Sequence, residues 1–294
     1  MTGAGKSISL VLGSGGARGM VHIGVIRWLE EHNYRIASVT GSSIGAMIGG
    51  IYAAGKLDSY EKWVRAIRKI DMVSLLDLSF ARDGFVKGER IISTLRDLIG
   101  AQLIEDLPIP FTAVASDIRK EKEAWINSGP LFDAIRASIS LPLFFTPFSL
   151  NGTLLLDGGI LNPVPIAPTF KDNTDMTIAV NLGGAPVRLP QRLPVDTPNN
   201  GNQAPLHEKI LQFISSLTAD DVDDDGSWDM FDITDQSFDA MQATIARQKL
   251  AAYPPDILIE LPRNVCGTLE FDRAAEMIDL GYSRTEQVLG SSMT

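Results

Sequence analysis

The sequence predicts an α/β protein in which a mostly parallel sheet is covered by helices on both faces. Three observations predict this fold class. Short apolar runs alternate with segments of helical periodicity along most of the chain. The first apolar run, residues 8–12, stops at a glycine cluster, as a buried parallel strand does before a helix. The chain has 294 residues, 45% hydrophobic and 21% charged, which is typical of one large globular domain.

The elements follow from apolar runs bounded by turn residues, and from apolar spacing of three and four where helices are expected. We predict strands at 8–12, 36–40, 111–115, 124–126, 153–156, 176–182 and 256–260. We predict helices at 20–31, 44–54, 58–70, 88–99, 130–138, 206–218, 236–251 and 271–289. Asp58 and Glu61 are spaced as a capping pair for the third helix. The single domain, 1–294, divides into a core at about 6–184, a Pro- and Asn-rich linker at about 185–205 and a C-terminal helical part at about 206–294.

Charge and cysteine content exclude several function classes. The formal net charge is −10, and the nine aspartates between residues 210 and 246 account for most of it. With no basic patch, we expect no nucleic-acid partner and no tight binding to anionic lipid. The single cysteine, Cys266, cannot form an internal disulfide, which favours a reducing compartment.

No segment predicts export or a membrane span. Residues 1–7 are small and polar, without the apolar region of a signal peptide. Residues 36–55 are uncharged and carry Gly41, Gly45 and Gly49 at the spacing of a membrane-helix dimer. The first half of that stretch is rich in Ser and Thr, so we interpret it as a buried strand, a tight turn and a helix. We expect a cytoplasmic protein that contacts a membrane surface only transiently.

The glycine-rich loop at residues 13–19 joins the first strand to the first helix. A dinucleotide fingerprint fails, because its third glycine would fall on Arg18. A phosphate-binding loop at residues 5–7 would precede the strand instead of following it. Consecutive glycines at a helix N-terminus can instead direct backbone N–H groups toward an anion. The loop is therefore either an oxyanion hole or simply a tight turn.

A second turn, residues 41–45, reads Gly-Ser-Ser-Ile-Gly and matches G-x-S-x-G between a strand and a helix. In that setting a sharp turn exposes the central hydroxyl, here that of Ser43, and the flanking glycines relieve crowding. The pattern favours a nucleophile over a structural glycine turn.

A serine nucleophile needs a proton acceptor. We expect His22 and His32 to be held within or at the end of the first helix. His207 is the only histidine late enough for the order Ser–Asp–His. Asp157 is the favoured base, because it directly follows an apolar run that we expect to be a strand. The carboxyl ends of parallel strands lie at one edge of a sheet, so Asp157 and Ser43 can meet there. The competing interpretation of Asp157 is an ordinary turn residue before two glycines.

Together, the segments 14–19, 41–45 and 157–159 resemble the patatin-like phospholipase family, most closely its bacterial branch related to neuropathy target esterase. Residues 22–25, 84–88 and 137–142 add to the resemblance, which covers about 6–184 well and 231–281 weakly. Ser14 stands where the family often has glycine. The resemblance implies a three-layer α/β/α fold and no cofactor.

The resemblance also implies the site and the reaction. It places a Ser–Asp dyad without histidine on Ser43 and Asp157. It implies an oxyanion hole from the backbone of Gly15, Gly16, Ala17 and Arg18. The implied reaction is hydrolysis of lipid acyl esters through an acyl-enzyme, of the phospholipase A or lysophospholipase type.

Two further segments bear on the substrate. Leu141, Phe144 and Phe145 belong to an apolar run that either lines an acyl pocket or packs in the core, the second being the commoner role. Arg18 either steers a phosphate head group or pairs with a carboxylate. The spacing of a calcium loop is matched by Asp221, Asp223, Asp225, Asp229 and Asp232, the last where glutamate is usual. We favour a solvated acidic loop without metal, which would repel anionic membranes and favour lysolipid or soluble ester substrates.

The sequence therefore predicts a serine esterase that acts on a lipid or acyl ester. The alternative is a lipid- or partner-binding regulator on the same fold with little or no turnover. A nucleotide-binding protein is a third interpretation. No motif indicates an oligomeric state.

Overall fold

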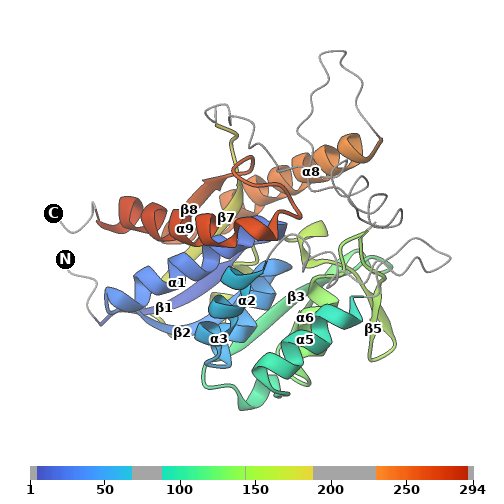
Figure 1. The fold of residues 1–294 in the computed structure, drawn as a ribbon, viewed down its shortest axis with the longest axis horizontal. Coiled ribbons are helices and arrows are strands. Elements are labelled where there is room, and N and C mark those ends of the chain that lie inside the picture. The colour runs from blue at the N-terminus through green and yellow to red at the C-terminus, as the bar shows by residue number, and fades with distance from the viewer. Residues whose placement is uncertain (1–4, 68–87, 143, 188–229, 291–294) are drawn as a thin grey trace, which may run out of the picture.

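A six-stranded sheet in the order β4-β3-β2-β1-β7-β8 forms the centre of the molecule (Figure 1). The computed structural model describes residues 5–67, 88–142, 144–187 and 230–290. All neighbouring strands pair in parallel except β4, which is antiparallel to β3. The strands are β1 (Ser7–Leu12), β2 (Arg35–Ser42), β3 (Phe111–Asp117), β4 (Lys122–Ile126), β7 (Met176–Gly184) and β8 (Ile257–Pro262).

Alternate side chains of β1 face two different cores, so the sheet is the middle of three layers. Ile8, Leu10 and Leu12 belong to the larger core, whereas Val11 packs with Ala179 and Ala246 in the smaller one. The larger core includes residues of α1 (Val21–Glu31), α2 (Ile44–Ala53), α3 (Leu57–Ala66), α5 (Glu89–Ile99), α6 (Leu131–Ser138) and α9 (Ala274–Leu289). The smaller core lies under α8 (Met230–Ala252), which contacts β7. The predicted three-layer α/β/α fold is confirmed.

The predicted elements within the described residues are present, but one strand lies elsewhere than expected. The apolar run 153–156 becomes β6 (Thr153–Leu155), which pairs with β5 (Phe148–Leu150) in a separate antiparallel hairpin. An isolated bridge between Leu156 and Ser116 ties this hairpin to the end of β3. The expectation that Asp157 follows a strand of the parallel sheet was therefore wrong. The bridge between Leu156 and Ser116 nevertheless places Asp157 next to the carboxyl end of β3.

The capping prediction for α3 was also wrong. Its N-cap is Lys56, and no side chain caps it. Asp58 and Glu61 instead accept hydrogen bonds from Arg27 of α1. The predicted helix 206–218, His207 and the acidic positions 221–229 lie outside the described residues.

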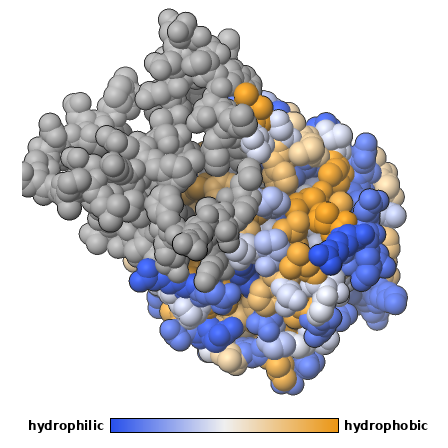
Figure 2. Space-filling model, turned by 90° about the vertical axis from the view of Figure 1, so that its right-hand side faces the viewer, coloured by the Kyte–Doolittle hydropathy of each residue, from blue (hydrophilic) through white to orange (hydrophobic). Residues whose placement is uncertain are grey.

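No helix in the described ranges has both the length and the apolar content needed to span a bilayer. On the coloured part of the face in Figure 2, hydrophobic residues gather in a patch beside the grey region, with hydrophilic residues around it.

Candidate active site

Ser43 occupies the sharp turn between β2 and α2. Its backbone has φ 55° and ψ −124°, a conformation that costs a residue with a side chain about 1–3 kcal/mol. The flanking glycines are required by close packing: a Cβ on Gly41 would lie 2.3 Å from the Gly45 carbonyl oxygen, and one on Gly45 would lie 2.1 Å from that of Leu12. The Ser43 hydroxyl makes no capping bond to its own helix and is directed to another partner.

That partner is Asp157. Ser43 Oγ donates to Asp157 Oδ2 across 2.5 Å. The second carboxylate oxygen, Oδ1, accepts the Gly159 N–H at 2.7 Å. Asp157 is fully buried, whereas Ser43 retains 9% exposure. The structure thus brings together two residues that are 114 positions apart in the chain.

Three serines fix the two backbones. The Ser43 N–H donates to Ser138 Oγ at 2.9 Å, and Ser138 Oγ donates to the Val114 carbonyl at 2.7 Å. Ser116 Oγ donates to the Asp157 carbonyl at 2.8 Å, and the Asp157 N–H donates to the Ser140 carbonyl at 3.0 Å. These serines were missed as site residues. Single serines carry no spacing signal, although Ser138 and Ser140 lie in the stretch 137–142 that contributed to the family resemblance.

Burial sets the acidity of the carboxyl group. Desolvation raises the pKa of Asp157 from 3.8 to about 7, against the opposing effect of the hydrogen bonds from Ser43 and Gly159. A carboxylate is ordinarily too weak a base to accept a serine proton near neutrality. Burial therefore makes the Asp157 carboxylate a stronger base than a solvent-exposed one.

The two histidines in the described residues have other partners. His22 is buried and donates from Nε2 to the Gly13 carbonyl at 2.8 Å, and desolvation lowers its pKa to about 4. His32 Nδ1 bonds the Trp28 carbonyl, and its ring stacks on the Trp28 ring with centroids 3.8 Å apart. Neither is a partner of the Ser43 hydroxyl, which bonds Asp157.

The glycine loop also lies near Ser43. Its residues 16–20 form a 3-10 helix that contacts α2. Gly16 has φ +57°, and a Cβ there would lie 2.5 Å from the Thr268 carbonyl oxygen. Gly16 lines the same cavity as Ser43. Among the described residues, the amides of Gly15 and Gly16 have no backbone acceptor.

One amide of the predicted oxyanion hole already has another acceptor. The Ala17 N–H already donates to the Thr268 carbonyl at 2.9 Å. Arg18 lines a different and smaller pocket, and its side chain pairs with Asp239 of α8 at 2.9 Å. Of the two roles expected for Arg18, the structure shows the pairing with a carboxylate. Because its guanidinium is buried in that ion pair, the pairing with a carboxylate is favoured over the steering of a head group.

An apolar cavity opens beside Ser43, with a volume of about 740 Å³ including its solvent-open mouth. Leu141, Phe144 and Phe145 lie on its wall, where the sequence had favoured core packing. The remaining walls come from α2, α3, α5 and a segment after β8. They are Ile44, Met47, Tyr60, Trp63, Val64, Ile67, Ile91, Leu95, Ile139, Thr268, Leu269 and Phe271. None of these lining residues is charged, so the cavity suits a hydrocarbon chain.

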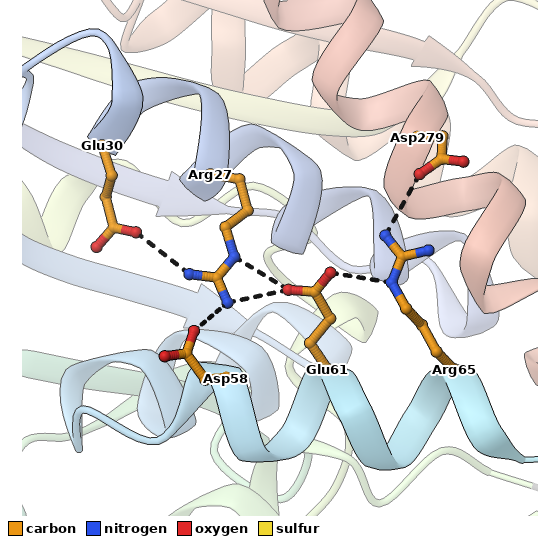
Figure 3. Close-up of polar contacts among 6 residues, drawn as sticks. All are labelled: Arg27, Glu30, Asp58, Glu61, Arg65 and Asp279. Atoms are coloured by element: carbon orange, nitrogen blue, oxygen red, sulfur yellow. Dashed lines mark hydrogen bonds and ion pairs between the residues drawn. The ribbon is translucent and has the colours of Figure 1, made fainter.

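Helix α3 forms a wall of this cavity with one face and a salt-bridge network with another (Figure 3). Arg27 of α1 bonds Asp58 and Glu61, and Arg65 bonds Glu61 at 2.9 Å and Asp279 of α9 at 3.3 Å. The wall is thereby joined to the two helices behind it.

The described residues contain no cluster of ligands that could hold a metal ion. The predicted calcium positions 221–229 lie outside them, as does the side chain of Asp232, so that alternative rests on sequence alone.

Comparison with known proteins finds a matching protein family. The profile of a family described as "Patatin-like phospholipase" matches residues 10–170. An uncharacterised NTE family protein of Mycobacterium tuberculosis is 38% identical over 96% of this chain and 91% of its own length. A patatin-like phospholipase domain-containing protein of Caenorhabditis elegans is 39% identical over 61% of this chain. A lysophospholipase NTE1 of Pyricularia oryzae is 27% identical over 95% of this chain, but the match spans only 18% of that protein.

Proposed function

Because the chain belongs to the patatin-like phospholipase family, we propose that it is a lipid acyl hydrolase that uses Ser43 as nucleophile and Asp157 as general base. One observation carries the proposal: the Ser43 hydroxyl donates across 2.5 Å to a fully buried carboxyl whose pKa lies at about 7. The strained turn presents that hydroxyl at the wall of an apolar cavity.

Acylation follows from this geometry. Above pH 7, ionised Asp157 accepts the proton as Ser43 Oγ attacks the acyl carbonyl carbon. The carbonyl oxygen gains negative charge, which the amides of Gly15 and Gly16 stabilise by donating to it. As the tetrahedral intermediate collapses, protonated Asp157 donates its proton to the leaving alcohol oxygen, and the acyl group remains on Ser43.

Deacylation repeats the same steps with water. Asp157 accepts a proton from the water molecule that attacks the acyl-enzyme, and then returns it to Ser43 Oγ as the fatty acid leaves. One group thus serves as base and acid in turn, which a carboxyl with a pKa near the working pH can do.

The cavity supports an acyl chain as the group that is recognised. A hydrocarbon tail can lie against the apolar side chains of α3 and α5, while a polar head group stays at the solvent-open side. A phospholipase A or lysophospholipase reaction fits this division. The lysophospholipases among the relatives support lysophospholipid as the first substrate to test.

Exposed apolar side chains support transient contact with a membrane surface. Trp125, Leu154 and Ile118 are each more than 40% exposed, and they lie on β4, on β6 and just after β3. Such residues favour partitioning into a lipid interface, where the substrate would be found.

The experiment is an acyl ester panel. Wild type, Ser43→Ala and Ser93→Ala are assayed on a lysophospholipid, a diacyl phospholipid, and soluble esters of short and long acyl chains. The hydroxyl of Ser93 lies on the exposed side of α5 and bonds the Arg90 carbonyl, so its loss controls for surface changes. We expect fatty acid release by wild type and Ser93→Ala only. Absence of release by folded wild type from every ester would refute the proposal and favour a binding protein.

A further inference from the structure

Arg18 is a buried cation held by three partners. Its Nε donates to the Gly15 carbonyl at 2.9 Å, and its Nη1 donates to the Arg263 carbonyl at 2.5 Å. Nη1 and Nη2 also donate to the two carboxylate oxygens of Asp239 at 3.1 and 2.9 Å. The Arg18 side chain is only 6% exposed and that of Asp239 26%. This bidentate pair links the glycine loop to α8, 221 residues further along the chain.

The bond to the Gly15 carbonyl matters because of the peptide that follows it. That carbonyl and the Gly16 N–H belong to one peptide unit, and no peptide bond in the described residues is cis. In a trans peptide the two groups point in opposite directions. Arg18 and Asp239 line a pocket of about 270 Å³, whereas Gly16 and Ser43 line the larger cavity. Holding the carbonyl toward Arg18 therefore turns the Gly16 N–H toward the Ser43 side.

The orientation of the Gly15–Gly16 peptide must be fixed by interactions with other parts of the chain. It lies between two glycines, and rotation of a peptide plane changes only ψ of the first residue and φ of the second. Gly15 has φ 166° and ψ 20°, and Gly16 has φ +57°. Glycine tolerates both signs of φ, so the backbone itself opposes a flip only weakly. A flipped peptide would present a carbonyl oxygen to the developing oxyanion, where it would be repulsive.

Helix α8 lies where it can fix the orientation of this peptide. Asp239, Gln242, Ala243 and Ala246 all line the smaller pocket, which is the spacing of one helix face. On the same face, Gln242 reaches the turn after the catalytic carboxyl: a Cβ on Gly159 would lie 2.4 Å from Gln242 Nε2. One helix thus contacts both the glycine loop and the Asp157 turn.

We propose that Asp239 is a positioning residue for the oxyanion hole, acting through Arg18 to fix the Gly15–Gly16 peptide with the Gly16 N–H directed at the reacting carbonyl. This role rests on the proposed acyl hydrolase function. Asp239 keeps the buried guanidinium paired, and the paired guanidinium keeps the Gly15 carbonyl away from the substrate.

The test compares Asp239→Asn with wild type on a soluble short-chain ester and on a trifluoromethyl ketone, whose adduct with the serine carries an oxyanion. We expect kcat to fall about tenfold to hundredfold while KM changes less than about twofold. The inhibition constant of the ketone should rise by a factor similar to the loss of kcat. The pH midpoint of the reaction should not move, because Asp157 is untouched.

Three further variants separate positioning from general damage. Asp239→Glu keeps the charge and should recover part of kcat. The double variant Arg18→Gln/Asp239→Asn removes both charges, so no buried charge is left without its partner. It can therefore be measured if Asp239→Asn alone does not fold. Its kcat should equal that of Arg18→Gln alone, as expected when Asp239 acts only through Arg18. Asp279→Asn, in an exposed pair with Arg65, is the matched control and should behave as wild type.

Distinct results overturn the two proposals. If wild type hydrolyses the ester but Asp239→Asn keeps its kcat and its affinity for the ketone, the positioning role is wrong and the acyl hydrolase stands. Losses of the two single variants that multiply in the double variant would also contradict the role. If folded wild type neither hydrolyses the ester nor binds the ketone, the function fails, and the positioning role fails with it.

Discussion

The two ends of the candidate site are built by different interactions. At the polar end, Ser43 and Asp157 are fixed by hydrogen bonds to buried serines and to backbone amides. At the other end, the cavity is lined mainly by apolar side chains from several helices and loops, none of them charged. Hydrogen bonds define a single geometry, whereas apolar walls define a volume and a surface.

This difference determines how each end responds to change. Removing one atom at the polar end removes a chemical step, so the effect should be nearly complete for every substrate. Changing a wall alters the space offered to the acyl chain, so the effect should be graded and depend on chain length. The five predictions below test that contrast, beginning with the largest expected effect.

Asp157→Asn should reduce kcat/KM at least about a thousandfold for all esters, because an amide cannot accept the serine proton. His207→Ala, which replaces the alternative base, should keep activity near wild type. Steady-state kinetics on one short and one long ester check both. Activity retained by Asp157→Asn together with loss in His207→Ala would replace the dyad by a triad.

The same variant should be more stable than wild type at alkaline pH. The folded-state pKa of Asp157 is about 7, above its ordinary value of 3.8, so ionisation of the buried carboxyl opposes folding. That penalty is absent below the unfolded pKa and grows as pH rises through the folded one, reaching the order of a few kcal/mol. We expect the Tm of Asp157→Asn to exceed that of wild type at pH 8 and to match it at pH 4. A lower Tm at pH 8 would assign Asp157 a structural role.

Wild-type activity should follow the titration of that carboxyl. Since the base form of Asp157 is needed, log kcat/KM should rise with unit slope below pH 7 and level off above it. A pH series from 5 to 9 with a soluble ester measures the profile. A plateau that extends down to pH 5 would show that the base has an ordinary carboxylate pKa.

At the apolar end, Leu95→Phe should lower kcat/KM for a long-chain ester about tenfold and leave a short-chain ester within about twofold. Leu95 is fully buried on α5 and lines the cavity, so a larger ring shortens the space for the tail. Leu98→Phe, on the same helix but outside the cavity lining, is the control. Equal losses on both esters would mean that the chain does not lie between α3 and α5.

The network behind α3 should give the smallest effect. Arg27→Gln removes contacts to Asp58 and Glu61, but its side chain is 28% exposed and that of Asp58 is 77% exposed, so the stabilisation is about 1 kcal/mol or less. We expect Tm to fall by about 2 °C in 50 mM salt, and by less in 0.5 M salt. Differential scanning calorimetry checks this. A loss of activity at unchanged Tm would show that the wall depends on the network for catalysis.

The sequence was most informative where a local pattern imposes the conformation. The glycines around Ser43 predicted the strained turn, and the apolar run at 8–12 ending in glycines predicted β1 and the loop after it. These features depend on close backbone approach and buried parallel strands, which leave signals within a few residues.

Other features depend on contacts that no local pattern encodes. The run before Asp157 reads equally well as a strand of the main sheet or of a hairpin, and its place is decided by the bridge from Leu156 to Ser116. The pair of Arg18 with Asp239 joins two distant segments, and single charges far apart give no spacing to detect. The family resemblance implied the Ala17 amide as part of the oxyanion hole, and its acceptor in the structure, Thr268, comes from a segment with no motif that could have indicated this bond.

The most direct test of the central claim is covalent labelling of Ser43. Wild type, Ser43→Ala and Asp157→Asn are treated with a fluorophosphonate at pH 8, and the modified peptide is mapped by mass spectrometry. The Ser43–Asp157 account predicts a single adduct on Ser43 in wild type, none in Ser43→Ala, and labelling of Asp157→Asn slowed at least about a hundredfold. An adduct on another serine, or equal labelling rates in wild type and Asp157→Asn, would contradict it.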